Sequence, residues 1–64
     1  MNAVKFYRKK ANLSQEQLAE QLGVDRSTVT KWETKENLPR ANKLLHIARI
    51  LGCGVDELLQ ETDL

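Results

Sequence analysis

Apolar residues recur three and four positions apart along most of the chain, which is the spacing of one face of a helix. No stretch alternates apolar and polar residues for long enough to indicate a strand. The first helical pattern places Val4, Phe6 and Tyr7 among lysines and an arginine, and it predicts a basic helix that ends near Asn12. We therefore expect an all-α chain.

The second helical pattern carries both a start and a stop signal. Ser14 is a favourable N-cap residue, and Gln17, three positions later, completes a capping-box pattern. Gly23 ends this helix, because glycine accepts the left-handed conformation that the end of a helix usually requires. The expected buried face consists of Leu18, Ala19 and Leu22.

A third helix is predicted directly after the second. Asp25 is expected to be its N-cap, and the negative charge suits the positive end of the helix dipole. Val29 and Trp32 are expected to face inward. Only residues 22–24 connect the two helices, so the helices must cross steeply and pack against each other. The pattern over residues 14–34 therefore predicts a helix-turn-helix.

The remainder of the chain predicts two more helices. Leu38 and Pro39 close a polar loop, because the residue before a proline is held out of the helical region. A helix is expected over residues 41–51, Gly52 ends it, and a short fifth helix follows. We predict a single compact five-helix domain over residues 1–64. The fourth helix is expected to turn Leu44, Ile47, Ala48 and Leu51 inward, and the fifth carries Val55, Leu58 and Leu59.

The size of the chain limits what can hold the fold together. A chain of 64 residues makes at most one domain and buries only about 60% of the surface that it exposes when unfolded. Cys53 is the single cysteine, so no internal disulfide forms, and with the single His46 it cannot complete a zinc site. Neither a metal nor another cofactor is predicted. We interpret Cys53 as a buried, inert thiol and His46 as a residue at the edge of a polar helix face.

Several classes of protein are disfavoured by what the sequence lacks. No apolar run is long enough to span a membrane and no signal-peptide pattern is present, so a cytoplasmic protein is expected. The sequence has no glycine-rich phosphate loop and no plausible pair of nucleophile and base, so an enzyme is not expected. No small-molecule ligand is indicated.

The net charge of +1 hides an uneven distribution of charge along the chain. Residues 1–49 hold all ten basic residues and five acidic ones, whereas residues 50–64 hold four acidic residues and no basic one. Such an asymmetry can turn a positive face toward an anionic partner and an acidic end away from it. Solvated charge without any partner is an equally good interpretation of charge alone.

The helix after Asp25 has a polar face opposite its apolar one. Arg or Lys can donate to guanine O6 and N7, and Ser or Thr can donate or accept, so such a face suits base edges and phosphates. An ordinary solvated helix face is the alternative. The face consists of Arg26, Ser27, Thr30, Lys31 and Thr34, none of which is acidic.

A longer pattern of residue types and spacings runs over about residues 3–60. On this pattern the chain resembles the lambda-repressor/Cro-like helix-turn-helix family of Xre-type regulators. The resemblance implies a lambda-repressor-like DNA-binding domain that regulates transcription. The matching residues are Arg8, Leu13, Ser14, Gln15, Leu18, Ala19, Gly23, Val24, Val29, Trp32, Glu33, Pro39, Ala48, Leu51, Gly52 and Leu58.

The resemblance implies a set of residues that meet double-stranded DNA in the major groove. Gln15, at the start of the second helix, would touch a phosphate and the first base, where a helix N-terminus itself favours phosphate oxygen. Arg26, Ser27 and Lys31 fall where members of the family read bases.

Four further positions would meet the DNA backbone and the flanks of the site. The resemblance places Thr28 and Thr34 at backbone or secondary contacts. Lys35 and Arg40, in and after the loop, would meet the flanking phosphates or the adjacent minor groove.

The same resemblance assigns Arg8 and Glu33 a structural role. In the family, these positions form an ion pair that ties the first helix to the end of the third. We therefore leave Arg8 out of the predicted DNA contacts.

Two positions depart from the family pattern. Lys35 stands where the family usually has glycine, so the loop must avoid or tolerate a positive φ at a non-glycine residue. Arg40 stands where Ser or Asp usually caps the next helix, which leaves amides at the start of that helix to water.

The function expected from these features is a sequence-specific regulator, with repression of an operon as the first expectation. A homodimer on a palindromic operator would supply the specificity that one module lacks. Leu38, Leu59 and Leu64 are candidates for the dimer contact, or else they cap the small core. The alternative function is a protein-interaction module, antitoxin-like or an anti-repressor, which the modest net charge and the acidic end favour.

Overall fold

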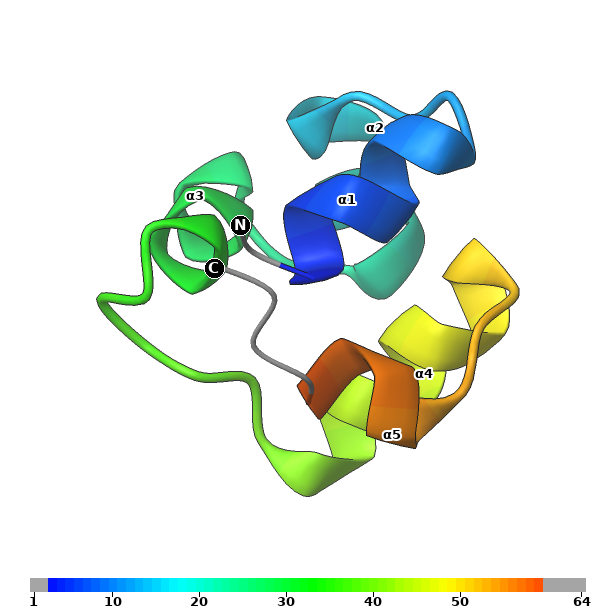
Figure 1. Ribbon diagram of the computed structural model, residues 1–64. Coiled ribbons are helices and arrows are strands. Elements are labelled where there is room, and N and C mark those ends of the chain that lie inside the picture. Colours follow the sequence, from blue (N-terminus) through cyan, green and yellow to red (C-terminus); the bar gives the residue numbers. More distant parts are fainter. Residues whose placement is uncertain (1–2, 60–64) are drawn as a thin grey trace.

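The computed structural model describes residues 3–59, which form five helices and no strand (Figure 1). Helix α2 packs against α3 and α4, and α1 packs against α3, α4 and α5. The prediction of an all-α fold with five helices is confirmed for these residues. The helices are α1 (Ala3–Lys10), α2 (Gln15–Leu22), α3 (Arg26–Glu33), α4 (Ala41–Leu51) and α5 (Val55–Leu59).

One apolar cluster joins all five helices. Leu18 of α2, Val29 of α3 and Ile47 of α4 are its fully buried members. The helix pair α2 and α3 has the most extensive contact, as the short connection between them predicted. The buried members of the cluster are Val4, Leu18, Ala19, Leu22, Val29, Trp32, Ile47, Ala48, Leu51 and Leu58.

The predicted capping box at the start of α2 is present. The Gln17 backbone N–H donates to Ser14 Oγ at 3.0 Å, and the Ser14 backbone N–H donates to Gln17 Oε1 at 2.8 Å. Two backbone amides that the helix cannot pair internally are therefore satisfied, which fixes where α2 begins.

Helix α2 ends in a Schellman motif, in which left-handed Gly23 turns the chain into α3. The Val24 N–H donates to the Ala19 carbonyl at 3.0 Å, and the Gly23 N–H donates to the Glu20 carbonyl at 3.3 Å. The φ of Gly23 is 72°, and a Cβ built there would meet nothing within 4 Å. The backbone conformation, rather than a lack of space, therefore favours glycine here.

The prediction for Asp25 is only half right. Asp25 occupies the N-cap position of α3 with an extended backbone, but its side chain makes no capping hydrogen bond. The carboxylate is exposed to water, so its remaining influence on α3 is its charge at the positive end of the helix dipole.

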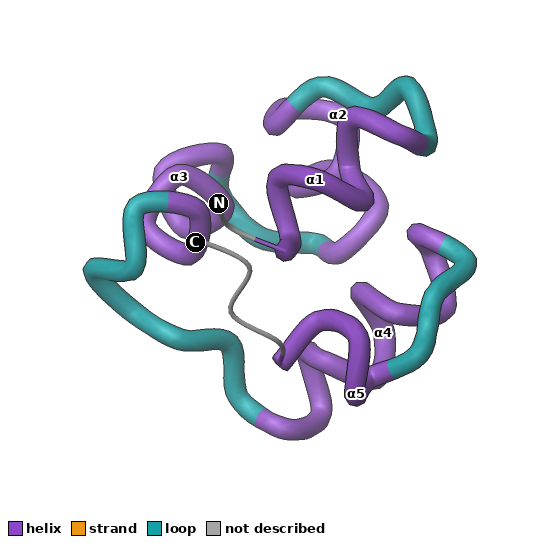
Figure 2. The backbone as a smooth tube through the Cα atoms, viewed as in Figure 1, coloured by secondary structure: helices purple, strands orange, loops and turns teal. Residues whose placement is uncertain are grey.

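The connection from α3 to α4 is the longest in the described part of the chain (Figure 2). Arg40 is the N-cap of α4, with an extended backbone and no side-chain capping bond, as its departure from the family pattern predicted. Gly52 ends α4 with a φ of 72°.

A hydrogen bond to the Glu57 carboxylate connects α5 to α1, in addition to their apolar contacts. The Tyr7 hydroxyl donates to Glu57 Oε2 at 3.0 Å, and the Gly54 N–H donates to Glu57 Oε1 at 2.7 Å. These two hydrogen bonds, the one from Gly54 first, hold the pKa of Glu57 below its usual range.

One expectation about the last part of the chain needs correction. Cys53 is half-buried rather than buried, because it packs on the edge of the core where the turn after α4 reaches the surface. Burial still raises the pKa of its thiol, which keeps the sulfur protonated and unreactive. Leu59 is 62% exposed and does not join the core, because Leu58 already occupies the inward position of this short helix. No helix among residues 3–59 is long and apolar enough to cross a membrane.

Candidate nucleic-acid interface

Helix α3 separates its apolar and polar residues onto opposite sides. Val29 and Trp32 are buried against the rest of the fold, whereas Arg26, Ser27 and Lys31 are exposed. We call these three exposed residues the reading face. Their side chains carry two positive charges and a hydroxyl on one side of a helix that is held rigidly by the other side.

A hollow in the surface lies along the reading face and brings in two further residues. The first of them is Thr30, which lies on the same helix. The second is Glu36, which the sequence argument missed. The hollow, called here the α3 hollow, is lined by Arg26, Ser27, Thr30, Lys31 and Glu36.

Glu36 reaches the α3 hollow because of how α3 ends. The Glu36 N–H donates to the Lys31 carbonyl at 2.9 Å, and the Lys35 N–H donates to the Trp32 carbonyl at 3.3 Å. These bonds form a Schellman motif, which folds the chain back beside the helix. An acidic residue from outside the helix therefore lies beside the polar face of α3, whose own residues are not acidic. The signal in the sequence was the position of Lys35, where the family usually has the glycine that such a turn prefers.

Lys35 adopts the strained conformation that the sequence raised as a question. Its φ is 66°, in the left-handed region that residues with a Cβ seldom occupy. The loop therefore keeps the turn of a glycine-containing relative, with a lysine in the glycine position.

A second hollow lies beside the N-terminus of α2. It is called here the α2 hollow, and Arg26 lines it as well as the α3 hollow. Arg26 therefore connects the start of α2 with the reading face. The α2 hollow is lined by Arg8, Ser14, Gln15, Glu16 and Arg26.

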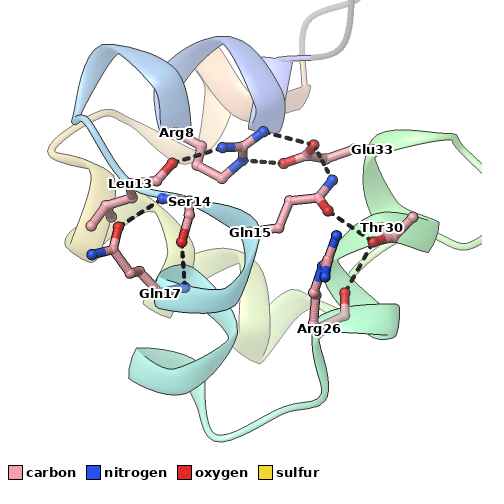
Figure 3. A network of polar contacts seen from close by, with 8 residues as sticks. All are labelled: Arg8, Leu13, Ser14, Gln15, Gln17, Arg26, Thr30 and Glu33. Carbon is pink, nitrogen blue, oxygen red and sulfur yellow. Dashed lines mark hydrogen bonds and ion pairs between the residues drawn. The ribbon is translucent and has the colours of Figure 1, made fainter.

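The predicted ion pair between Arg8 and Glu33 is confirmed. Arg8 Nε lies 2.6 Å from Glu33 Oε2, and Arg8 Nη2 donates to Glu33 Oε1 at 3.1 Å (Figure 3). The side chains are only 9% and 3% exposed. Arg8 Nη1 also donates to the Leu13 carbonyl at 2.7 Å. The pair is buried and hydrogen-bonded, which is the condition under which an ion pair survives burial.

Gln15 belongs to the same network. Gln15 Nε2 donates to Glu33 Oε1 at 2.9 Å, and Thr30 Oγ1 donates to Gln15 Oε1 at 3.0 Å. Figure 3 shows the carboxamide of Gln15 lying between Glu33 and Thr30, with the side chain of Arg26 directed toward the same region. Gln15 therefore links the start of α2 to α3.

The remaining predicted contact residues lie at several places: Thr28 is in the first turn of α3, and Thr34, Lys35 and Arg40 lie in the connection after it. Thr34 follows α3, and its hydroxyl donates to the Lys31 carbonyl at 3.3 Å. Thr28 is half-buried on another side of α3, in a third hollow that it shares with Arg40. The structure thus brings Arg26, Ser27 and Lys31 together and places Thr28 and Arg40 apart from them.

Comparison with known proteins agrees with this architecture. A family model described as helix-turn-helix matches residues 4–58. The HTH-type transcriptional activator BcrR of Enterococcus faecalis is 43% identical over 53 residues, which cover 83% of this chain and 26% of BcrR. The cryptic phage CTXphi transcriptional repressor RstR of Vibrio cholerae is 37% identical over 51 residues, which cover 80% of this chain and 46% of RstR.

The extent of the match differs between relatives. An uncharacterised HTH-type transcriptional regulator of Methanocaldococcus jannaschii is 35% identical over 57 residues, which cover 89% of this chain and 86% of that protein. The chain spans about a quarter of BcrR and less than half of RstR. Because the family model matches residues 4–58, the chain belongs to the Xre/Cro-like helix-turn-helix family.

Proposed function

We propose that the protein is a sequence-specific regulator of transcription that binds double-stranded DNA and is not an enzyme. The observation that carries the proposal is the position of α3, which is packed through Val29 and Trp32 and presents Arg26, Ser27 and Lys31 outward. An α-helix with its side chains is about 10–12 Å in diameter, and the major groove is about 12 Å wide. Such a helix fits into the groove with its open side against the base edges.

The reading face supplies the base contacts in this proposal. Arg26 and Lys31 donate to guanine O6 and N7, and Ser27 acts as donor or acceptor. Gln15, in the α2 hollow, donates to a phosphate oxygen beside the N-terminus of α2.

Contacts on the flanks complete the footprint. Thr28 and Thr34 approach the sugar-phosphate backbone, while Lys35 and Arg40 meet flanking phosphates or the adjacent minor groove. Because phosphate contacts carry no sequence information, these four residues set affinity and register rather than base preference.

We propose further that the protein binds a palindromic operator as a homodimer. One module of this size buries only about 600–1,000 Å² on DNA, and two-fold binding to half-sites about one turn apart adds the missing specificity. Leu38 is 78% exposed, Leu59 is 62% exposed and Leu45 is 58% exposed, which makes these side chains candidates for the contact. Leu64 lies outside the described residues.

Repression is the direction that we propose for the regulation. RstR is named as a repressor and BcrR as an activator, so the family contains both. A reporter gene placed behind the selected operator measures the direction: expression falls in the presence of the protein if it represses.

A protein-interaction module is the second candidate function, and Glu36 is the observation that favours it. The Glu36 carboxylate lies in the α3 hollow, where it opposes the approach of phosphate. Arg26 and Lys31 argue against this second function, because they line the same hollow and leave its net charge positive.

Selection of binding sites from random duplex DNA separates the two functions. The regulator enriches a palindrome, and its affinity for that palindrome falls steeply as salt increases, because phosphate contacts release counterions. A protein that enriches no sequence above bulk DNA is not a sequence-specific regulator.

A further inference from the structure

The hydroxyl of Thr30 does not stand free on the reading side of α3. Thr30 is half-buried, and its Oγ1 lies 3.0 Å from Gln15 Oε1 and 3.2 Å from the Arg26 carbonyl. A hydroxyl has one hydrogen to donate, so the two acceptors share it. The side chain is therefore used inside the protein, between α2 and the first turn of α3.

The chemistry of Glu33 fixes which way the Gln15 carboxamide points. An ionised carboxylate only accepts, so the atom of Gln15 that faces Glu33 must be the donor Nε2. Gln15 Oε1 then faces Thr30 and accepts from its hydroxyl. A flipped carboxamide would set oxygen against the carboxylate and leave the Thr30 hydroxyl facing a donor.

Arg8 holds the Glu33 carboxylate in place, and Glu33 in turn fixes the orientation of the Gln15 carboxamide. Two guanidinium nitrogens of Arg8 donate to its carboxylate, and a third donates to the Leu13 carbonyl. The chain of bonds runs from α1 through Glu33 to Gln15 on α2 and returns through Thr30 to α3 (Figure 3).

One hydrogen of Gln15 Nε2 is left over once these bonds are made among the described residues. Gln15 lines the open α2 hollow together with Arg26. The carboxamide therefore offers this hollow a hydrogen-bond donor, which suits a phosphate oxygen.

We infer that Thr30 is a positioning residue of the DNA-binding surface: its hydroxyl and Glu33 lock Gln15 as a hydrogen-bond donor to a DNA phosphate. Thr30 itself reads no base. This inference rests on the proposed function. The Gln15 side chain comes from α2 and is bonded to two residues of α3. As a consequence, the phosphate contact of α2 and the base contacts of α3 keep a fixed spacing.

A double-mutant cycle on the selected operator tests the inference. Thr30→Val keeps the shape and removes the hydroxyl, and we expect it to weaken DNA binding about threefold to tenfold, the effect of one hydrogen bond. Thr30→Ser keeps the hydroxyl, and we expect it to bind the operator with an affinity close to that of the wild type. In a Gln15→Ala background, Thr30→Val changes affinity less than about twofold, because its effect passes through Gln15.

Two further measurements distinguish positioning from direct contact and from damage to the fold. The base preference and the salt dependence of binding stay unchanged in Thr30→Val, because neither a base contact nor a phosphate charge contact is lost. In the free protein, we expect ¹⁵N relaxation to detect a more mobile Gln15 carboxamide in Thr30→Val than in the wild type, and wild-type mobility in Thr30→Ser.

The inference and the proposed function fail in different ways. Wild-type protein that enriches no duplex overturns the proposed function. If the wild-type protein binds its operator, either of two results overturns the inference and leaves the proposed function standing. The first is a Thr30→Val effect that persists in the Gln15→Ala background or alters one base preference. The second is a Gln15 carboxamide whose mobility does not change.

Discussion

The guanidinium of Arg8, on α1, grips the carboxylate of Glu33, the last residue of α3, with 2.6 Å between Arg8 Nε and Glu33 Oε2. The two residues are 25 positions apart, and both side chains are nearly excluded from water. The pair holds the far end of the proposed reading helix against the first helix of the fold. The same carboxylate also accepts from Gln15, the residue that we propose contacts a DNA phosphate.

Removing one member of this pair should be severely destabilising. We expect Arg8→Ala to lower the free energy of unfolding by about 3–5 kcal/mol, because the Glu33 carboxylate is left buried and uncompensated. The free energy of unfolding of a domain of this length is only about 3–10 kcal/mol in total, so the variant should be close to unfolding at room temperature.

Urea denaturation measures the change in the free energy of unfolding. The double variant Arg8→Met with Glu33→Leu is the control and should be more stable than Arg8→Ala. A loss below about 1 kcal/mol in Arg8→Ala would mean that the pair behaves as an exposed one.

Replacing Lys35 by glycine should stabilise the protein. Glycine occupies a φ of 66° without the steric cost that a Cβ brings, and we expect a gain of about 1 kcal/mol in the free energy of unfolding. Lys35→Ala is the matched control, because alanine removes the lysine contacts and keeps the Cβ. Gly23→Ala, at a φ of 72°, should lose a similar amount. An equal gain in Lys35→Gly and Lys35→Ala would trace the effect to the lysine side chain instead.

A better cap should strengthen the start of α4. Arg40 holds the N-cap position without a side-chain capping bond, so Arg40→Ser should add about 0.5–2 kcal/mol relative to Arg40→Ala. If Arg40 contacts a flanking phosphate, both variants also lower the salt dependence of DNA binding by the same amount. Thermal unfolding and a salt titration measure these effects separately, and equal stability of the two variants would speak against the capping argument.

Lys31 should set the preference for one base pair in each half-site. We expect Lys31→Ala to cost about 1–3 kcal/mol on the preferred sequence and to relax the preference at that position alone. Arg49→Ala, which removes one positive charge from a hollow lined by Gln21, His46 and Ile50, is the control and should leave base preference intact. Uniform weakening of Lys31→Ala on every sequence would make Lys31 a phosphate contact.

Acid should loosen α5 from α1 through Glu57. Its pKa is lowered by the Gly54 N–H and the Tyr7 hydroxyl, so the stabilisation is present above the ordinary value of 4.5 and is lost as pH falls through the lower folded value. The urea midpoint of the wild type should therefore decline below pH 4.5 more steeply than that of Glu57→Gln. Tyr7→Phe should lie between the two, and identical profiles would remove Glu57 from this role.

The helices could be predicted because their signals are local. Ser14 and Gln17 mark a start, Gly23 and Gly52 mark ends, and each signal acts within one turn of helix. The ion pair between Arg8 and Glu33 came from family resemblance, since no local rule connects residues so far apart.

The missed features depend on how distant parts of the chain meet. Thr30 lies on the polar side of its helix by spacing, yet the crossing of α2 over α3 brings Gln15 within reach of its hydroxyl. Glu36 lies outside the helix by sequence, and the turn at Lys35 folds it back beside the reading face. Both outcomes follow from geometry between elements, which a helical pattern does not contain.

The left-handed conformation of Lys35, after the end of α3, also affects where the backbone opens locally. Four described residues have a positive φ: Asn12, Gly23, Lys35 and Gly52. Glycine and asparagine tolerate this conformation, whereas lysine opposes it. We therefore expect the turn that follows α3 to open at a lower cost than the glycine turns that close α2 and α4. The amide hydrogens of Lys35 and Glu36 should then exchange with solvent before those of the glycine turns. The segment that adjusts most cheaply to a DNA flank is thus attached directly to the helix proposed to enter the groove.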